Sequence, residues 1–344
     1  MNVGGRRGER RWKSRAVVGV DPGVRLSLLD RSRTRAGRPD AEALTGTVER
    51  ARWAEELGYE RFWVAEHHAV PGIASGAPPV LMAAVGAATS RIRLGSGGIM
   101  LPHHQPLVVA EQLRMLEALH PGRVEAGLGR SSGFTAPVRA ALREGPDDTE
   151  RFADDVQELR ALLDGEGPVT VRPAGGPVPL LLLATGRGVA LAARLGLPVV
   201  VGGPVLAADT VTGLLDAYRR DFRPSPSHER PHVVISLDVL VAEDARTARE
   251  LALPEAWAMA QARRTGSFPP LERPEDVRAQ PWPDQVRRRV EASLDAAVAG
   301  DARTVRRALE RLQARTGADE LLASTSTWDR DALRAADAAL RALV

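Results

Sequence analysis

The sequence contains no cysteine among its 344 residues. This absence excludes disulfides, thiolate metal sites and cysteine nucleophiles, and it is typical of the reducing cytoplasm, where we expect this protein. No stretch approaches the roughly 18 apolar residues that a membrane span requires, so we expect no membrane partner. The N-terminus is basic without an apolar core, so we do not expect it to be a secretory signal. We expect residues 1–22 to be a flexible leader and residues 23–344 to form a single domain.

Lysine is almost as scarce as cysteine, because Lys13 is the only one in the chain. The 47 basic residues are therefore nearly all arginine, and with 44 acidic residues the formal net charge is only +3 despite a pI of about 10.0. A nucleic-acid-binding protein would gather its arginines on one face with aromatic residues between them. Here arginine alternates with acidic residues along helical patterns, as in residues 50–56. This arrangement is typical of solvated helix faces, and we expect no nucleic-acid partner.

What the chain does contain is a regular alternation of short apolar runs with longer segments whose apolar residues recur at helical spacing. We expect strands at residues 24–29, 61–65, 92–101, 123–129, 179–185, 198–203, 233–242 and 319–325. We expect helices at 41–58, 78–89, 106–119, 149–165, 188–196, 207–222 and 329–343, with a further helical stretch from Asp244. Strands that alternate with helices imply parallel pairing, which fits either a barrel or an open doubly wound sheet. The number of strands and the chain length favour an α/β fold of the (β/α)8 barrel type.

One segment interrupts the alternation. Residues 263–283 contain five prolines and follow neither the helical nor the strand period. A long excursion of this kind in a compact domain is often a lid over a binding site. We therefore expect an extended, mobile lid loop at residues 263–283, before the last strand.

The ends of the predicted strands carry the candidate functional residues, because in a barrel the loops after the strands form the site. Glu66, His67 and His68 directly follow the second predicted strand. An ordinary polar loop, a catalytic group and a set of metal ligands are all open interpretations, and His103 and His104 could add further ligands. Adjacent residues on an extended chain point to opposite sides, so His67 and His68 cannot easily bind one ion. We expect no metal site.

Glycine-rich turns interrupt or follow the next strands. Residues 95–98 contain three glycines, which indicates a bulge or another group, such as a planar ring, pressed against the backbone. Residues 127–133 and 184–188 are glycine-rich strand-to-helix turns that also carry arginine and hydroxyl groups. Backbone N–H groups at a helix N-terminus together with a guanidinium bind phosphate well. Two such turns from neighbouring strands favour a phosphorylated cofactor.

Four segments of the chain occur in a specific order: ERFWVAEHH, TSRIRLGSGGIMLPHHQPLVVAEQ, LEALHPGRVEAGLGR and LLATGRGVALAARLGLP. In this order they resemble the bacterial luciferase-like flavin-dependent monooxygenases, and the similarity extends over about residues 24–344. The resemblance implies a (β/α)8 TIM barrel of the bacterial luciferase type that binds reduced FMN at the C-terminal ends of its strands. It also implies a homodimer formed through helices near the second and third strands.

The resemblance further assigns roles to individual residues. His67 takes the position of the active-site histidine, with Glu66 as its catalytic neighbour, and the Gly97-Gly98 bond falls where the luciferases have a non-prolyl cis peptide. Residues 263–283 match the mobile active-site loop. The implied cofactor-binding residues, which include the phosphate-binding arginine and turn, are Gly97, Gly98, Arg130, Thr185, Gly186, Arg187 and Gly188.

Two positions depart from the luciferase pattern. Gly129 stands where the luciferase alpha subunit has a reactive cysteine, and Ala184 stands where its phosphate turn has a glutamate. Neither change removes flavin binding, but both argue against activity on long-chain aldehydes. We interpret the chain as a monooxygenase relative and not as a light-emitting system.

The resemblance implies that reduced FMN, supplied by a separate NAD(P)H:flavin reductase, reacts with dioxygen to a C(4a)-peroxyflavin that oxygenates a small organic substrate. With an ordinary pKa of about 6.5, His67 would hydrogen-bond to it or shuttle a proton near neutral pH, and His68 would be structural. Three alternatives stay open. They are a deazaflavin-dependent oxidoreductase of the same superfamily, a non-catalytic flavin-binding relative, and a metal-dependent barrel hydrolase.

Overall fold

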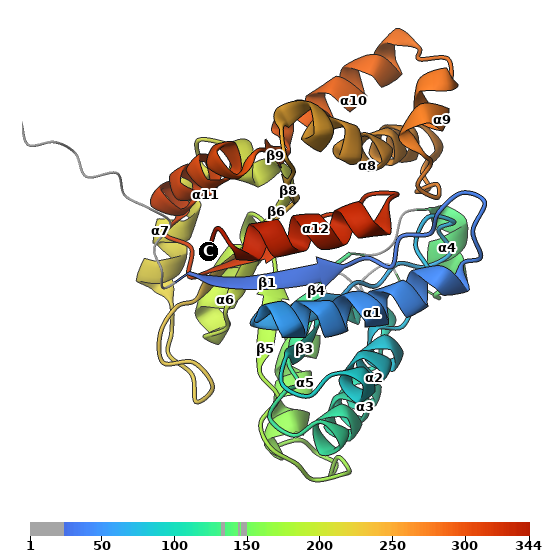
Figure 1. Ribbon diagram of the computed structural model, residues 1–344. Helices are drawn as coiled ribbons and strands as arrows, with labels where there is room; N and C mark the ends of the chain where they lie inside the picture. Colours follow the sequence, from blue (N-terminus) through green and yellow to red (C-terminus); the bar gives the residue numbers. More distant parts are fainter. Residues whose placement is uncertain (1–23, 132–134, 144, 146–149) are drawn as a thin grey trace, which may run out of the picture.

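The computed structural model describes residues 24–131, 135–143, 145 and 150–344, so the expected leader at 1–22 lies outside the described residues. In the described part, parallel strands form a closed barrel in the order β1-β10-β7-β6-β5-β4-β3-β2 (Figure 1). Because β1 pairs with both β10 and β2, the doubly wound alternative is excluded and the predicted (β/α)8 barrel is confirmed. The barrel strands are β1 Arg25–Asp30, β2 Arg61–Val64, β3 Arg93–Met100, β4 Ala126–Gly129, β5 Leu180–Leu183, β6 Val199–Gly202, β7 Val233–Leu237 and β10 Glu320–Ala323.

Helices follow the strands and cover the outside of the barrel. The helices with a predicted range begin and end within a few residues of it, and the helix at 106–119 coincides with its prediction, whereas the helices at 136–141, 274–279, 284–296 and 302–316 have no predicted range. None of the described helices is both long and apolar enough to cross a bilayer. The helices are α1 Ala41–Leu57, α2 Pro78–Ala88, α3 Pro106–Leu119, α4 Ala136–Ala141, α5 Phe152–Asp164, α6 Arg187–Leu195, α7 Val211–Asp221, α8 Ala245–Thr265, α9 Pro274–Ala279, α10 Asp284–Ala296, α11 Ala302–Thr316 and α12 Arg330–Arg341, with 3-10 turns η1 Leu101–His103 and η2 Gly203–Ala207.

The strands are apolar on both faces because both faces are buried. Side chains that point outward pack under the helices, as Leu28 and Phe62 do. Those that point inward fill the barrel with a separate cluster made of Leu29, Trp63, Ala65, Leu181, Val200, Val234 and Leu322. A filled barrel has no channel, so a ligand must bind at one of its two mouths.

The predicted long strand at 233–242 is wrong, because the chain leaves the barrel in its middle. Residues before Asp238 form β7, whereas residues after it form β8 Val239–Val241, which pairs in parallel with β9 Val298–Gly300 in a separate two-stranded sheet. Asp238 accepts hydrogen bonds from Arg31 at 2.9 Å and from Ser324 at 2.8 Å. These contacts come from distant parts of the sequence, so the local apolar pattern gave no sign of the break.

The excursion at 263–283 is only partly a loop, which corrects the expectation of an unstructured segment. It contains the last turn of α8 and helix α9, and together with α10 these helices form what we call the insertion unit, residues 245–296. This unit projects from the barrel (Figure 1) and has a core of its own, made of Leu253, Ala256, Trp257, Ala260, Val277, Val286, Val290 and Leu294. That the segment moves as a lid stays a prediction.

The extended stretch between α8 and α9 forms backbone hydrogen bonds with the loops that follow β1 and β2. The Gly72 N–H donates to the Phe268 carbonyl at 2.7 Å, and the Leu271 N–H donates to the Thr34 carbonyl at 2.9 Å. The Leu271 carbonyl in turn accepts from the Ala36 N–H at 2.8 Å. These backbone bonds place the stretch over the barrel end at which the strands terminate, which we call the C-terminal mouth.

Candidate active site

The candidate residues come together at the C-terminal mouth because all barrel strands run in one direction. Glu66 and His67 follow β2, Gly97-Gly98 lies in β3, Arg130 follows β4 and Thr185 follows β5. These four strands are neighbours in the barrel order. The structure therefore brings the predicted residues to one continuous half of one mouth.

Glu66 is buried and forms the centre of a hydrogen-bonded triad. Its Oε1 lies 2.7 Å from His68 Nε2 and 2.8 Å from His104 Nε2, and its Oε2 accepts the Met100 N–H at 2.9 Å. Burial alone would raise the pKa of Glu66, but the hydrogen bonds from His104 and His68 outweigh it and lower the pKa to about 2. Glu66 is therefore a charged carboxylate that fixes both imidazoles and the end of β3.

The same three side chains are of metal-ligand types, and their ligand atoms lie within 4.8 Å of one another. His104, and not His67, completes the group with Glu66 and His68. That the protein holds no metal stays a prediction. Each histidine Nε2 lies at hydrogen-bond distance from the same carboxylate oxygen, so we treat the group as a positioning triad.

His67 is half-buried and its electrostatic surroundings differ from the expectation. Burial, reinforced by the positive charges of Arg31 and Arg33, lowers the pKa of His67 to about 4. The assumption of an ordinary pKa near neutrality is therefore wrong, and the imidazole is neutral at pH 7. The ring of Phe268, from the insertion unit, meets the imidazole edge-on with centroids 6.0 Å apart.

The glycines of β3 allow close packing of the chain on itself. A Cβ at Gly95 would lie 2.2 Å from Trp63 Nε1, and a Cβ at Gly98 would lie 2.8 Å from the Gly127 carbonyl oxygen. The expected bulge is present as a register shift between Gly97 and Ile99, and the Gly97-Gly98 bond is cis as the resemblance implied. The group pressed on Gly95 is thus the indole of Trp63, a planar ring from the protein itself.

The two glycine-rich turns lie side by side, because β4 and β5 pair directly. Arg130 is exposed after β4, and Thr185, Gly186 and Arg187 are exposed at the N-terminus of α6. Gly186 has a φ of 53°, and a Cβ there would meet nothing within 4 Å. The Gly188 N–H donates to the Thr185 carbonyl at 3.2 Å, which closes the turn. Residues 132–134 of the first turn lie outside the described residues.

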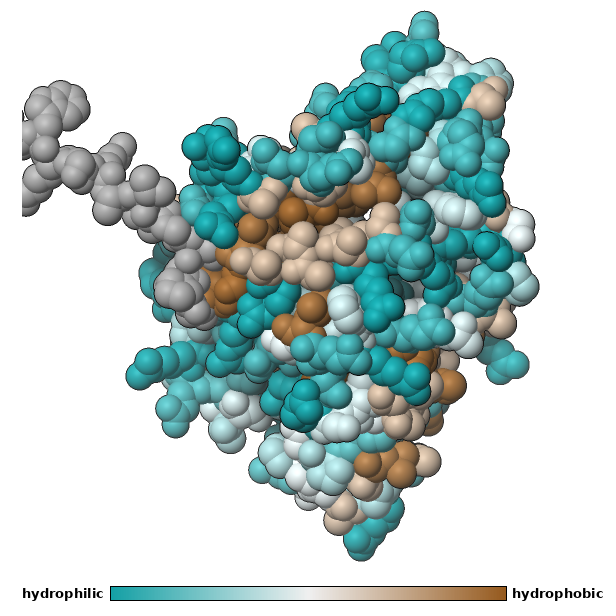
Figure 2. Space-filling model, viewed as in Figure 1, coloured by the Kyte–Doolittle hydropathy of each residue, from teal (hydrophilic) through white to brown (hydrophobic). Residues whose placement is uncertain are grey.

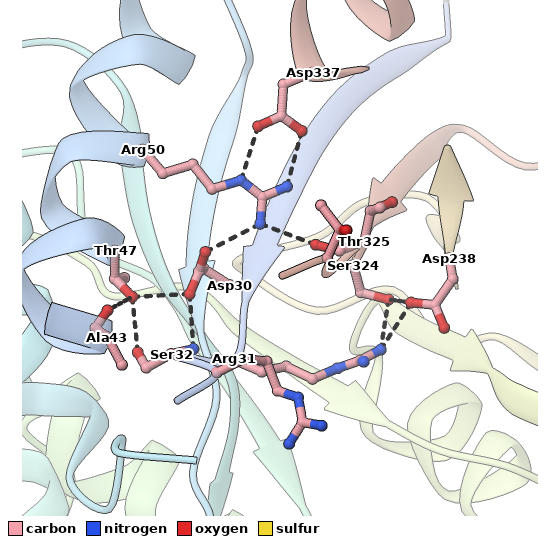
Figure 3. Close-up of polar contacts among 12 residues, drawn as sticks. Asp30, Arg31, Ser32, Ala43, Thr47, Arg50, Asp238, Ser324, Thr325 and Asp337 are labelled. Atoms are coloured by element: carbon pink, nitrogen blue, oxygen red, sulfur yellow. Dashed lines mark hydrogen bonds and ion pairs between the residues drawn. The ribbon is translucent and has the colours of Figure 1, made fainter. Parts of the chain in front are cut away.

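Three groups near His67 were missed or undervalued from the sequence. Arg31 and Arg33 follow β1, and their position after a strand marks them as candidates for the site. Their effect on the pKa of His67 can be recognised only from the tertiary structure. Phe268 lies in the excursion that the sequence predicts to be a lid, but no local pattern singles out this residue. Asp30, another strand-end residue, is buried in an ion pair with Arg50 and is structural (Figure 3).

Known proteins of similar sequence match most of the chain. The family model described as luciferase-like monooxygenase matches residues 24–320. A luciferase-like monooxygenase of Escherichia coli (strain K12) is 37% identical over 321 residues, which cover 91% of this chain and 95% of the relative. An N-acetyl-S-alkylcysteine monooxygenase of Bacillus subtilis (strain 168) is 43% identical over 152 residues, which cover 44% of this chain and 46% of the relative.

Solved structures share the architecture. The apo-MsnO8 structure has 34% sequence identity and a TM-score of 0.83, with 93% of this chain and 97% of that chain covered. Two more distant structures, each 17% identical, show the shared fold alone. They are the oxygenating constituent of 3,6-diketocamphane monooxygenase from Pseudomonas putida in complex with FMN, with a TM-score of 0.71 and 92% and 96% coverage, and an F420-dependent secondary alcohol dehydrogenase, with a TM-score of 0.64 and 93% and 98% coverage.

The fold, the order of the strand-end residues and the match over residues 24–320 agree with one another. The chain belongs to the luciferase-like monooxygenase family of oxidoreductases.

Proposed function

We propose that this protein binds reduced FMN at the half of the C-terminal mouth formed by β2 to β5 and uses dioxygen to oxygenate a small organic substrate. The observation that carries the proposal is the pair of turns after β4 and β5. An exposed Arg130, which has no acidic partner among the described residues, follows the strand next to an open glycine turn at the N-terminus of α6. His67 and Gly97-Gly98 occupy the two adjacent strands on the same mouth.

The groups at the two turns fit a phosphate. The donors are the Arg130 guanidinium, the Thr185 hydroxyl and the N-terminus of α6, which is nine residues long. The first turn of α6 carries no acidic residue. Such a set favours a dianion through charge-assisted hydrogen bonds and the helix dipole. Open space above Gly186 leaves room for the phosphate oxygens.

Bound reduced FMN would supply the activation of dioxygen, and the groups of the chain would control the proton and the water. The neutral imidazole of His67 carries one N–H and one unprotonated nitrogen, so it can donate a hydrogen bond or accept a proton at the reacting face. Phe268 and the stretch around it would cover His67 and exclude water, which limits side reactions. The charged Glu66 holds the end of β3 through the Met100 N–H and so acts as a positioning residue.

A deazaflavin used for hydride transfer is the second candidate, because an F420-dependent dehydrogenase shares the fold. We propose FMN because the more similar relatives are named monooxygenases, and oxygenation requires activation of dioxygen. We further propose that a separate NAD(P)H:flavin reductase delivers the reduced FMN.

Anaerobic titration with reduced FMN and with reduced F420, followed by admission of dioxygen, distinguishes oxygenation with FMN from hydride transfer with F420. Tight binding of reduced F420 alone would refute the FMN proposal.

Replacement of Arg130 by alanine is expected to weaken the binding of reduced FMN by about ten- to a hundred-fold, the cost of one charge-assisted hydrogen bond. The binding of reduced riboflavin, which has no phosphate, should be unchanged by the same substitution. Anaerobic fluorescence or calorimetric titration of both flavins measures the difference. Arg91→Ala is the matched control, because Arg91 is exposed and precedes β3 at the opposite mouth. Equal losses for FMN and riboflavin would show that Arg130 does not bind the phosphate.

The homodimer is also a proposal, and an apolar surface on α2 and α3 supports it. Val80 is 72% exposed, Met115 56% and Leu119 65%, which is unusual for large apolar side chains. Met115 and Leu119 are four residues apart and share one face of α3. We expect Met115→Glu to convert a dimer to a monomer in sedimentation or light-scattering measurements. Val169→Glu, at an apolar residue that is 49% exposed outside both helices, should leave the dimer intact. A wild-type monomer would contradict the proposal.

A further inference from the structure

A large cavity lies between the insertion unit and the half of the C-terminal mouth that the proposed flavin site leaves free. Its volume is about 930 Å³. Its floor is formed by the ends of four strands, through Arg31 after β1, Gly203 after β6, Asp238 after β7 and Ser324 after β10. These strands are consecutive in the barrel order, and β2 to β5 make up the other half. The cavity and the proposed flavin site therefore share one mouth but no strand.

Arg31 lies at the boundary between the two halves. It lines the cavity, and its side chain bonds to Asp238, Ser324 and Glu255. Its positive charge also helps to keep His67 neutral, after the larger effect of burial. A molecule in the cavity therefore lies on the same side of the barrel as the proposed reacting groups.

The walls of the cavity are mainly apolar and come mostly from α8, α10, α11 and the small sheet. Short side chains predominate, which leaves the space open. Figure 2 shows further apolar surface between α12 and the insertion unit, outside the cavity, because no residue of α12 lines it. The apolar and small wall residues are Leu237, Val239, Leu240, Ala252, Ala256, Met259, Ala260, Ala292, Leu294, Ala296, Ala297, Val298, Ala308 and Leu312.

The charges around the cavity are unbalanced toward the positive. Its two carboxylates are already neutralised, since Asp238 holds Arg31 and Glu255 holds both Arg31 and Arg33. Arg263, Arg289, Arg311 and Arg315 also line the cavity, and none of them has an acidic partner among the described residues. Of these four, only Arg289 on α10 is half-buried, whereas the others are exposed. Arg289 is thus a partly desolvated cation with no carboxylate paired to it in the described part of the chain.

We propose that this cavity holds the organic substrate and selects a molecule with an apolar body and a carboxylate-like anionic group, which Arg289 binds. The inference rests on the proposed function, because it names the substrate class of that monooxygenase. An apolar pocket with one well-placed charge fixes the orientation of a ligand, and a charge-assisted hydrogen bond distinguishes the anion from its neutral analogue. The anionic end would lie toward Arg289 on α10, and the apolar body would lie along the apolar walls.

Calorimetric titration with octanoate and with octanamide tests the proposal, because the two probes differ in charge but hardly in shape. In the absence of flavin, we expect the wild-type chain to bind octanoate about tenfold or more tightly than octanamide. Arg289→Gln should remove this preference while the affinity for octanamide stays within about twofold. Arg288→Gln, at an exposed neighbour on α10 that does not line the cavity, should retain the preference.

Equal affinities for the two probes in the wild type, an unchanged preference in Arg289→Gln or no saturable binding of octanoate would each overturn the proposal. Thermal unfolding of both variants verifies that they fold. Because the titration uses no flavin, its failure is distinct from a failure to bind reduced FMN, which is measured separately in the same variants. Weak octanoate binding with normal FMN binding would reject only the substrate class.

Discussion

Replacement of His67 by alanine is expected to lower the yield of oxygenated product per reduced FMN consumed by about a hundredfold or more, while FMN still binds. The expectation follows from its position after β2, under Phe268, and from the typical contribution of a general acid or base. Without the imidazole, consumption of reduced FMN would continue but would end in hydrogen peroxide. Simultaneous measurement of product, hydrogen peroxide and FMN affinity distinguishes this uncoupling from a loss of binding. An unchanged product yield would remove His67 from the mechanism.

The pH dependence of the wild type provides a second readout for His67. Because burial lowers the pKa of His67 to about 4, its protonation state does not change between pH 6 and pH 8. We therefore expect the product yield of the wild type to show no inflection near pH 6.5 that arises from His67.

The stability of the fold depends on pH in the opposite direction to that given by a histidine whose pKa is raised by an acidic partner. The unfolded chain takes up this proton at about pH 6.5, so the folded state loses stability as the pH falls from there to about 4.

His120→Ala is the matched control for the activity measurement. His120 follows α3 and precedes β4, so it lies at the opposite mouth of the barrel. Its removal should leave the product yield per FMN unchanged. A comparable loss in both variants would indicate a general effect of histidine removal on the fold.

Replacement of Arg50 by methionine is expected to reduce the free energy of unfolding by about 3–5 kcal/mol, the typical cost of leaving buried charges without their partner. Arg50 lies between two carboxylates in Figure 3. Its Nε and Nη2 each donate to Asp337 at 2.8 Å, and its Nη1 donates to Asp30 at 3.0 Å. The three side chains are only 3% to 12% exposed. Urea unfolding followed by circular dichroism measures the loss.

Arg52→Met on the same helix is the control for this prediction. Arg52 is exposed and makes one 3.3 Å hydrogen bond to the Ala88 carbonyl, so its loss should change stability by at most about 0.5 kcal/mol. Adding Asp337→Leu to Arg50→Met removes one of the two stranded carboxylates, and we expect it to recover part of the loss. Equal stabilities of the Arg50→Met and Arg52→Met variants would contradict the assignment of a buried network.

The repeating elements of the barrel were predictable because their signals are local. The predicted strands at 24–29, 61–65 and 198–203 agree with β1, β2 and β6 to within one or two residues, since each is a short apolar run between turn signals. The helix at 106–119 begins at a proline, and the helix at 41–58 has a glycine at its end in the left-handed conformation. Strand direction then brings His67, Arg130 and Thr185 to one mouth without any knowledge of contacts.

The pairing of distant groups could not be predicted in this way. The prolines of the excursion predict a loop, whereas the core shared by α8, α9 and α10 joins residues from three separate helices. The grouping of Glu66 with His68 and His104 depends on a loop from β3, and the crowding at Gly95 comes from Trp63 on the next strand.

The sequence by itself determined the alternation of strands and helices, the family and the identity of the residues at the strand ends, because apolar periodicity and turn residues act over a few positions. Only the tertiary structure decided where the strand at 233–242 breaks, that His67 is neutral, and which half of the mouth is left as a cavity. These properties arise from burial and from charges such as Arg31, Asp238 and Glu255, which meet only when the barrel closes.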